Sequence, residues 1–240
     1  MNADQLDALV RDLREDAPRN TSIINFIERN EILGVYREGR SARVQGRSDH
    51  VWNYFSSESE GELRALADQL GDGDDHFAAL EDWMLPIVCR GRELSWCLRM
   101  MKFVLPASVE LPVTVAGEIG ALSVADAEHI YENSNYQQYI SVDYTRDCIR
   151  GGPTVAIRED GLLVAWAMTQ DDGAMGFLHV LEPYRSRGFG RRLTIALSSK
   201  LREKGQLPFA YVAEDNGNSI ALLTSLGFVP DRAVQWVELK

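Results

Sequence analysis

The pattern of hydrophobic and polar residues predicts a mixed α/β first half of the chain. The chain opens with a predicted helix from Asp4 to Glu15, and a second helix is expected from Asn20 or Thr21, either of which can cap its first turn. Short runs rich in apolar and β-branched residues then predict strands. The remaining predicted elements of this half are strands around 34–36, 42–44 and 51–55, helices over 60–70 and 77–84, and strands over 86–89 and 96–105.

Proline separates this half from a second half with a clearer order of elements. We interpret the segment between Pro106 and Pro112 as a linker, because proline interrupts regular elements. Beyond it, Ser123-Val-Ala-Asp126 has the form of a capping box, and two Asp-Gly pairs mark hairpin turns. The predicted elements are helices from 123 and over 142–149, strands over 154–158, 162–169 and 175–181, a helix over 188–204, a strand over 207–213, a helix over 219–226 and a strand over 234–239. The sequence therefore predicts two domains, residues 1–112 and 113–240.

Composition narrows the possible partners. The formal net charge of -11 disfavours nucleic acid, since binding to a phosphate backbone normally needs a basic surface. The three cysteines indicate no disulfide framework, and no His or Cys cluster has the spacing of a zinc site. The first residues show no secretory signal, and no stretch approaches the roughly 18 apolar residues of a membrane span. We therefore expect a cytoplasmic protein without a metal, a monomer or a homodimer.

One loop, between a predicted strand and a predicted helix, carries the clearest chemistry. It holds Arg185, Arg187, Gly188 and Gly190 where the helix begins. At a helix start the backbone N–H groups lack intrahelical partners, and the helix dipole adds positive charge. Glycine lets the backbone approach a phosphate closely, and arginine adds charge-assisted hydrogen bonds. This loop is therefore predicted to bind phosphate groups, in preference to the simpler interpretation of a solvated turn.

Two motifs in the second half resemble the GNAT N-acetyltransferases. Arg185-x-x-Gly188-x-Gly190 matches the Arg/Gln-x-x-Gly-x-Gly/Ala signature of that superfamily. Asn216-Gly-Asn-Ser-Ile-Ala-Leu-Leu-Thr-Ser-Leu-Gly-Phe228 resembles its second signature, and the likeness is greatest to the FR47-like and glycine N-acyltransferase-like branch. The resemblance covers roughly residues 113–240. It implies a mixed central sheet flanked by helices, with a degenerate GNAT-like first half that lacks the glycine motif and does not bind coenzyme A.

The resemblance also implies which residues hold an acyl-CoA, with acetyl-CoA the expected co-substrate. The strand at 177–180 would pair with the pantetheine arm, beside a neighbouring strand that splays away. The amides of 187–191 would hold the pyrophosphate, and transfer would run directly from thioester to amine. The implied coenzyme-binding residues are Leu178, Val180, Arg185, Ser186, Arg187, Gly188, Phe189, Gly190, Arg191 and Asn216.

At the positions of the usual catalytic acid and base, the sequence departs from the superfamily pattern. Leu223 occupies the position of the usual Tyr acid, for which Tyr211, Tyr136 or Tyr139 are possible substitutes, and Ala174 occupies the position of a Glu base. His179 has a suitable ordinary pKa for a base. The other candidate bases are Glu214 with Asp215, Asp172 with Asp171, and a water chain to a remote carboxylate.

Tyr136-Gln-Gln-Tyr139 lies between the two helices that, by the resemblance, cover the acceptor side of this fold. This makes it a candidate for the acceptor pocket, and the alternative is a plain surface loop. Together these features predict an acyl-CoA-dependent N-acyltransferase. The expected acceptor is a primary amine of a small molecule, such as the amino acid glycine. The alternatives are an N-acetyltransferase that acts on proteins and a non-catalytic sensor that binds acyl-CoA.

Overall fold

The chain folds into two compact units, and each is described by itself. The computed structural model describes residues 3–112 and 119–240. The first unit comprises the chain up to Lys102 together with Asp231–Lys240, and the second comprises Phe103–Pro230. These units differ from the predicted domains 1–112 and 113–240, because the last strand belongs to the first unit. The predicted boundary also adjoins 113–118, which lie outside the described residues.

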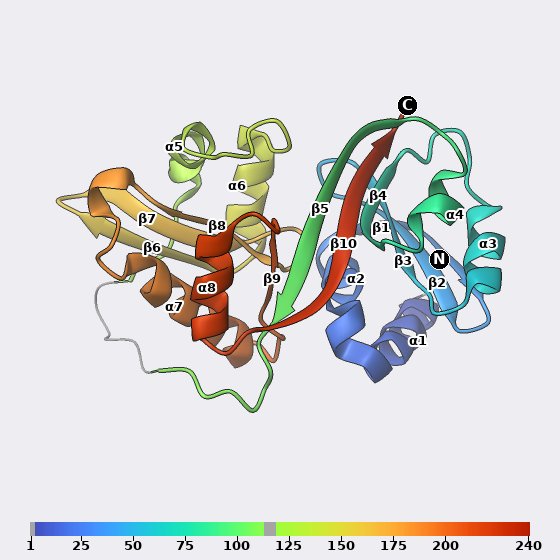
Figure 1. Cartoon of the computed structure of the whole chain (residues 1–240), viewed down its shortest axis with the longest axis horizontal. Coiled ribbons are helices and arrows are strands. Elements are labelled where there is room, and N and C mark those ends of the chain that lie inside the picture. The colour runs from blue at the N-terminus through green and yellow to red at the C-terminus, as the bar shows by residue number, and fades with distance from the viewer. Residues whose placement is uncertain (1–2, 113–118) are drawn as a thin grey trace. The chain divides into compact units, whose positions relative to one another are not determined.

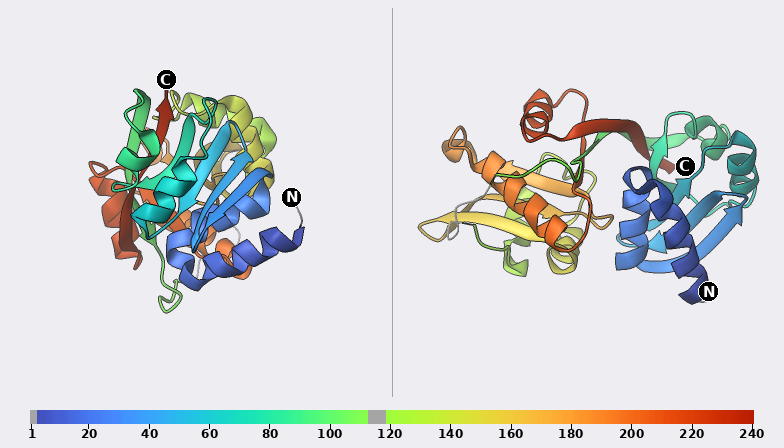
Figure 2. Two further views of the ribbon diagram at one scale, coloured as in Figure 1. Left: turned by 90° about the vertical axis from the view of Figure 1, so that its right-hand side faces the viewer. Right: turned by 90° about the horizontal axis from the view of Figure 1, so that it is seen from below.

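The first unit is a mixed sheet with helices on both faces (Figures 1 and 2). Its strands lie in the order β1-β2-β3-β4-β10-β5. All neighbours among β1, β2 and β3 are antiparallel, whereas β3 and β4 are parallel. The elements are α1 (Ala3–Leu13), the 3-10 turn η1 (Arg14–Asp16), α2 (Ala17–Arg29), β1 (Glu31–Glu38), β2 (Ser41–Arg47), β3 (Val51–Ser56), α3 (Glu60–Ala67), β4 (His76–Glu81), α4 (Leu85–Cys89), β5 (Leu94–Val104) and β10 (Val229–Leu239).

Alternation along β3 assigns its side chains to two separate cores. Trp52 and Tyr54 pack with the apolar faces of α1 and α2. Phe55 points the other way and packs with Leu63 and Leu66 of α3. Successive side chains of a strand point to opposite faces, so one strand supports both helical layers.

Two elements of this unit differ from the sequence prediction. Residues 77–84 were predicted to form a helix and instead contain β4, whose Phe77, Ala78 and Leu80 are all buried. A strand buried on both faces has no alternating pattern to distinguish it from a helix. Residues 86–89 were predicted to form a strand and instead lie in α4, where Pro86 occupies the start of the helix, a position that suits proline.

The second unit confirms the predicted order of elements after the linker. Its strands lie in the order β9-β8-β7-β6, with α5 and α6 on one side and α7 on the other (Figure 1). The predicted capping box is present: Ser123 Oγ accepts from Ala125 N, and Ser123 N donates to Asp126. The elements are η2 (Val124–Asp126), α5 (Ala127–Glu132), α6 (Val142–Gly151), β6 (Thr154–Glu159), β7 (Leu162–Thr169), β8 (Met175–Val180), η3 (Glu182–Tyr184), α7 (Phe189–Glu203), β9 (Phe209–Val212) and α8 (Gly217–Ser225).

The two halves of the chain repeat one order of elements. Leaving the 3-10 turns aside, the run α1 to β5 and the run α5 to β10 both read α-α-β-β-β-α-β-α-β. In this correspondence β3, α3 and β4 of the first unit match β8, α7 and β9 of the second. Both matched strand pairs are parallel. The repeat therefore makes a direct comparison of the two strand-to-helix loops possible.

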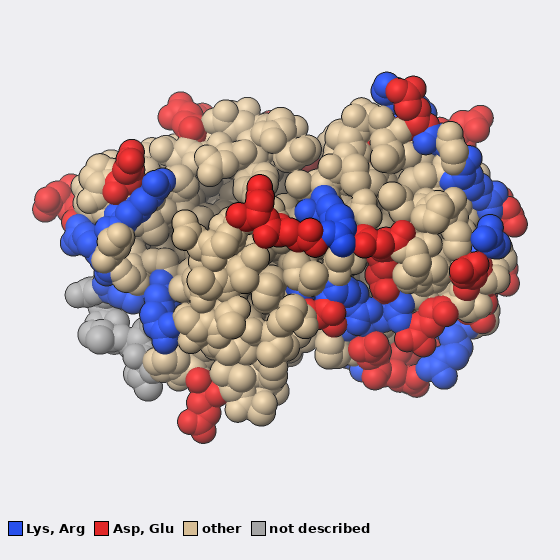
Figure 3. Space-filling view, viewed as in Figure 1, with Lys and Arg blue, Asp and Glu red and all other residues tan. Residues whose placement is uncertain are grey.

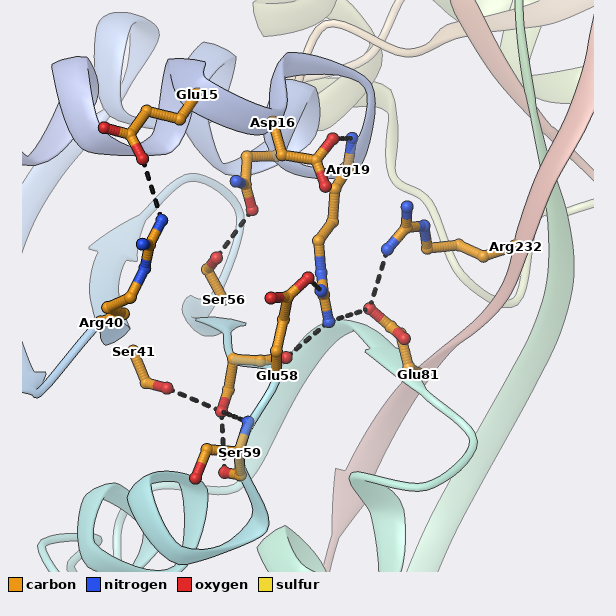
Figure 4. Close-up of polar contacts among 12 residues, drawn as sticks. Glu15, Asp16, Arg19, Arg40, Ser41, Ser56, Glu58, Ser59, Glu81 and Arg232 are labelled. Atoms are coloured by element: carbon orange, nitrogen blue, oxygen red, sulfur yellow. Dashed lines mark hydrogen bonds and ion pairs between the residues drawn. The ribbon is translucent and has the colours of Figure 1, made fainter.

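Ion pairs hold the last strand in the first unit. Arg232 of β10 contacts Glu81 at 3.1 Å, and Arg19 of α2 contacts the same carboxylate at 2.8 Å (Figure 4). Arg19 also binds Glu58, in the loop that precedes α3. One carboxylate thus joins an N-terminal helix to the C-terminal strand, which explains why residues from Asp231 onward pack with this unit.

A second carboxylate lies at the centre of a buried polar network. Asp74 is 3.1 Å from the guanidinium of Arg43, which is 1% exposed. Asp74 also accepts hydrogen bonds from Gln45, Asn53 and the backbone of Gly71. A buried arginine without its counter-charge is costly, so Asp74 is a required part of this core.

We predict that Asp74→Ala destabilises the protein by about 3–5 kcal/mol, since it leaves the buried Arg43 charge without its partner. Urea unfolding followed by circular dichroism measures the effect. Glu15→Ala is the matched control, because it removes a carboxylate from the solvent-exposed pair with Arg40 and is expected to change the midpoint little. Equal midpoints for the two variants would show that the network does not stabilise the fold.

Candidate active site

The loop between β8 and α7 has the backbone geometry of an anion site. Gly188 precedes the helix with φ 77° and Ser186 also has a positive φ, of 62°. The first bond of the helix runs from Arg192 N to Gly188 O at 3.1 Å. The amides of 189–191 therefore lie before the hydrogen-bond ladder begins, where their N–H groups point out of the helix end. No acidic residue lies in the first turn of α7.

The arginines of this loop have partners within the protein. Arg185 Nε donates to Val180 O at 3.2 Å, and Arg191 donates to Ser225 Oγ at 3.0 Å. Arg187 makes a two-point ion pair with Glu159 and lies 4.7 Å above the Phe189 ring. Lys and Arg side chains gather at this end of the second unit (Figure 3). The arginines thus supply positive potential, while the amides are the groups aimed at an anion.

A bulge bends β8 directly before this loop. Along β7, Trp166 and Met168 are two residues apart, but their partners on β8, His179 and Gly176, are three apart. The extra residue falls at Phe177, whose φ of 54° is unusual for a bulky side chain. Such bulges redirect a strand and are common beside active sites.

After the start of the bulged strand, β8 and β9 separate. Their register pair is Met175 with Ala210, at the beginning of β8. In the first unit the matching strands β3 and β4 pair at three successive positions, beginning with Trp52 and His76. The edge of β8 from 177 to 180 is therefore left without strand partners on the β9 side. Such an edge can pair with an extended ligand as another strand would.

Three aromatic rings lie on the α5–α6 side of β8. His179 stacks on Trp166, with ring centroids 4.8 Å apart and an angle of 18° between the planes. His129 of α5 meets the same Trp166 edge-on, with centroids 5.4 Å apart. Burial, the charge of Arg185 and the charge of His129 lower the pKa of His179 below its ordinary value. The neutral imidazole, which can accept a proton, is therefore the favoured form near neutral pH.

The other predicted base candidates lie elsewhere. Asp172 is 3% exposed, and its Oδ1 accepts from Ala174 N in the turn before β8, at the far end of that strand from Gly188. Glu214 is exposed and follows β9. Of the three base candidates, His179 alone lies on the bulged edge beside the loop.

Asn216, which was predicted to contact the coenzyme, caps α8: its Oδ1 accepts a hydrogen bond from Ser219 N at 3.1 Å.

The predicted acceptor residues lie in the connection between α5 and α6. Tyr136 is 37% exposed, and its carbonyl accepts from Tyr139 N at 2.9 Å. Burial, the charge of Asp215 and then Tyr139 raise the pKa of the Tyr136 phenol. The influence of Asp215, which follows β9, places this connection near the end of β9. Leu223 is buried, so a core side chain occupies the position of the usual Tyr acid.

Two features of the site were not predicted. The bulge follows Gly176, and a glycine inside a strand is a signal of a bulge, but the residue in the left-handed conformation is the aromatic Phe177. His129 stands at one position of a short helix with no motif around it, and only the fold brings it to Trp166.

The described residues contain no group of three or more His, Cys, Asp or Glu side chains placed to hold a metal ion. Among the described helices, none combines the length and apolar character that crossing a membrane requires.

Known proteins share this fold. Residues 155–237 match the family model of FR47-like protein. The X-ray structure of a Drosophila protein has a TM-score of 0.81 at 19% identity, with 100% of this chain and 97% of that chain covered. A GCN5-related N-acetyltransferase from Kribbella flavida has a TM-score of 0.59 at 15% identity, over 93% of this chain and 95% of the other. A tandem GNAT protein from the clavulanic acid biosynthesis pathway has a TM-score of 0.55 at 17% identity, over 99% and 96%. These likenesses confirm the predicted GNAT fold, including a GNAT-like first half, and the FR47-like relationship.

Proposed function

Because this chain has the GNAT fold with an FR47-like segment over residues 155–237, we propose that its second unit is an N-acyltransferase that takes an acyl group from coenzyme A. The observation that carries the proposal is that two sets of backbone groups lie next to each other. The amides before Arg192 point outward at the start of α7. Among the described residues, the adjoining edge of β8 has no strand partner on the β9 side after Met175. In this proposal, the pyrophosphate of coenzyme A binds the amides at the start of α7, and its extended, amide-bearing pantetheine arm pairs with the edge of β8.

The first unit does not bind the coenzyme in this proposal. Its α3 is the match of α7, but Glu60 and Glu62 lie in the first turn of α3, where they would repel a pyrophosphate. Ser59 already caps this helix by accepting from Glu62 N. β3 also pairs with β4 at three successive positions, whereas β8 and β9 share a single register pair.

The chemistry that we propose is a direct transfer. Neutral His179 takes a proton from the ammonium group of the acceptor, which leaves a free amine. The amine attacks the thioester carbonyl, the new C–N bond forms and the C–S bond breaks. Coenzyme A leaves as the thiolate and receives a proton from the imidazolium or from the attacking nitrogen. Leu223 is buried at the position of the usual Tyr acid, so the proposed transfer does not use a side-chain acid at that position.

The acceptor that we propose is a small primary amine, such as an amino acid. Asp215, which follows β9, acts on the charge of the Tyr136 phenol, and Glu214 precedes Asp215 in the chain. Carboxylates favour a cationic acceptor over an anionic one. Acetyl is the expected acyl group. A protein amine and a non-catalytic sensor are the alternatives that the following experiments separate.

We predict that Gly188→Glu abolishes acetyl-CoA binding, because it puts a carboxylate among the pyrophosphate-binding amides. Isothermal titration calorimetry of wild type and variant measures the loss. Gly205→Glu is the matched control, since Gly205 also has a positive φ, of 70°, and open space around it, but lies at the other end of α7. It brings the same strain and charge. Binding that survives Gly188→Glu, or is lost equally in both folded variants, would contradict the proposed site.

We predict that His179→Gln lowers kcat/KM by about 10²–10⁴, the usual contribution of a positioned base. The assay is thiol release from acetyl-CoA with a panel of amino acids, amines and peptides. Since the pKa of His179 is lowered, wild-type activity should persist through pH 6.5 and fall only below it. Thiol release with none of the amines, in a protein that binds acetyl-CoA, would instead indicate a sensor. Preference for peptides would indicate a protein acyltransferase.

A further inference from the structure

Two imidazoles share one indole in the second unit. Trp166 and His179 are register partners on β7 and β8, and their rings stack at 4.8 Å. His129 comes from α5 and approaches the same indole edge-on at 5.4 Å. Trp166 is 1% exposed, so it is a fixed support for both rings. Neither ring can move far without losing this contact.

His129 has one nitrogen that the protein does not satisfy. Its Nε2 is buried, yet it has no hydrogen-bond partner among the described residues. Buried polar atoms are nearly always hydrogen-bonded, and an exception often has a functional reason. A buried water molecule would satisfy it.

We propose that His129 is a positioning residue that forms a pair with His179 on Trp166 and keeps His179 in its neutral, proton-accepting form. This inference rests on the proposed function, and it adds a residue that no sequence motif marks. In the pair, His179 accepts the proton of the acceptor ammonium, whereas His129 acts only through His179.

The surroundings of His179 agree with this role. His129 on α5 and Arg185 after β8 both act on its charge, and both lower its pKa after burial, the largest cause. On the β7 side it meets Trp166, which does not titrate. The Tyr144–Asp171 hydrogen bond, from α6 and the turn before β8, lies next along the strand, where the Tyr144 ring packs near Phe177. On the opposite face of the sheet, α7 packs against β8.

Coupled titration gives a test that does not depend on activity. When two sites interact, removing one shifts the titration of the other, and the effect is reciprocal. In His129→Gln the pKa of His179 should rise, because the charge of His129 is one of the causes that lower it. NMR titration of the His179 imidazole resonances, without substrate, measures the shift.

Glu128→Gln is the matched control. Glu128 precedes His129 on α5, but its carboxylate is 71% exposed and pairs with Arg146. It should leave the titration of His179 unchanged within error. His129→Asn provides a second variant if His129→Gln fails to fold. Unchanged titration of His179 in the folded His129 variants would overturn the pair.

The pH profile then separates this inference from the proposed function. In His129→Gln the acid limb of kcat/KM should move to higher pH by the shift seen in the NMR titration, while the alkaline plateau is retained. A purely structural role would lower the plateau without moving the limb. If the NMR titrations shift and the limb does not, the pair stands and the assignment of His179 as the base fails.

Discussion

The structure of the proposed site depends on the separation of β8 from β9. Parallel neighbours in a sheet normally satisfy each other's backbone groups, and β3 and β4 do so at three successive positions. The bulge at Phe177 turns β8 away after Met175 pairs with Ala210, so the strand ends with one edge unpaired. The helix that follows begins with amides that are also outside any ladder. In the proposed function, these two sets of backbone groups bind one extended, phosphate-bearing ligand.

The repeat of element order allows the fold to be separated from the site. The two halves of the chain have the same order of elements, and a tandem GNAT protein has a similar fold. What differs is local: a glycine with positive φ before α7, against a serine cap and glutamates at the start of α3. In the first unit, buried and partly buried charged residues pair with one another within the fold. Asp74 pairs with Arg43, and Glu81 pairs with Arg19 and Arg232. A fold can be duplicated while the chemistry stays in one copy.

Much of the second unit was predictable from the sequence, because its signals are local. Ser123 and Asp126 form the expected capping box, and the loop holding Gly188 joins strand to helix as its motif predicted. Predictions failed where burial removes periodicity, as in β4, or where an element is short, as in α4. The ion pair of Arg187 with Glu159 and the meeting of His129 with Trp166 join distant segments. Such contacts follow from the packing of the sheet, which no local pattern encodes.

The central claim is that one of the two GNAT-like copies holds the coenzyme, and hydrogen–deuterium exchange tests it most directly. Exchange would be measured by mass spectrometry with and without saturating acetyl-CoA. Exchange is expected to slow in peptides covering residues 175–191, where the edge of β8 and the start of α7 gain hydrogen bonds. No change is expected in peptides covering residues 51–62, the matching strand and helix start of the first unit. Unchanged exchange at 175–191, or equal slowing in both segments, would contradict binding of the coenzyme by the second unit alone.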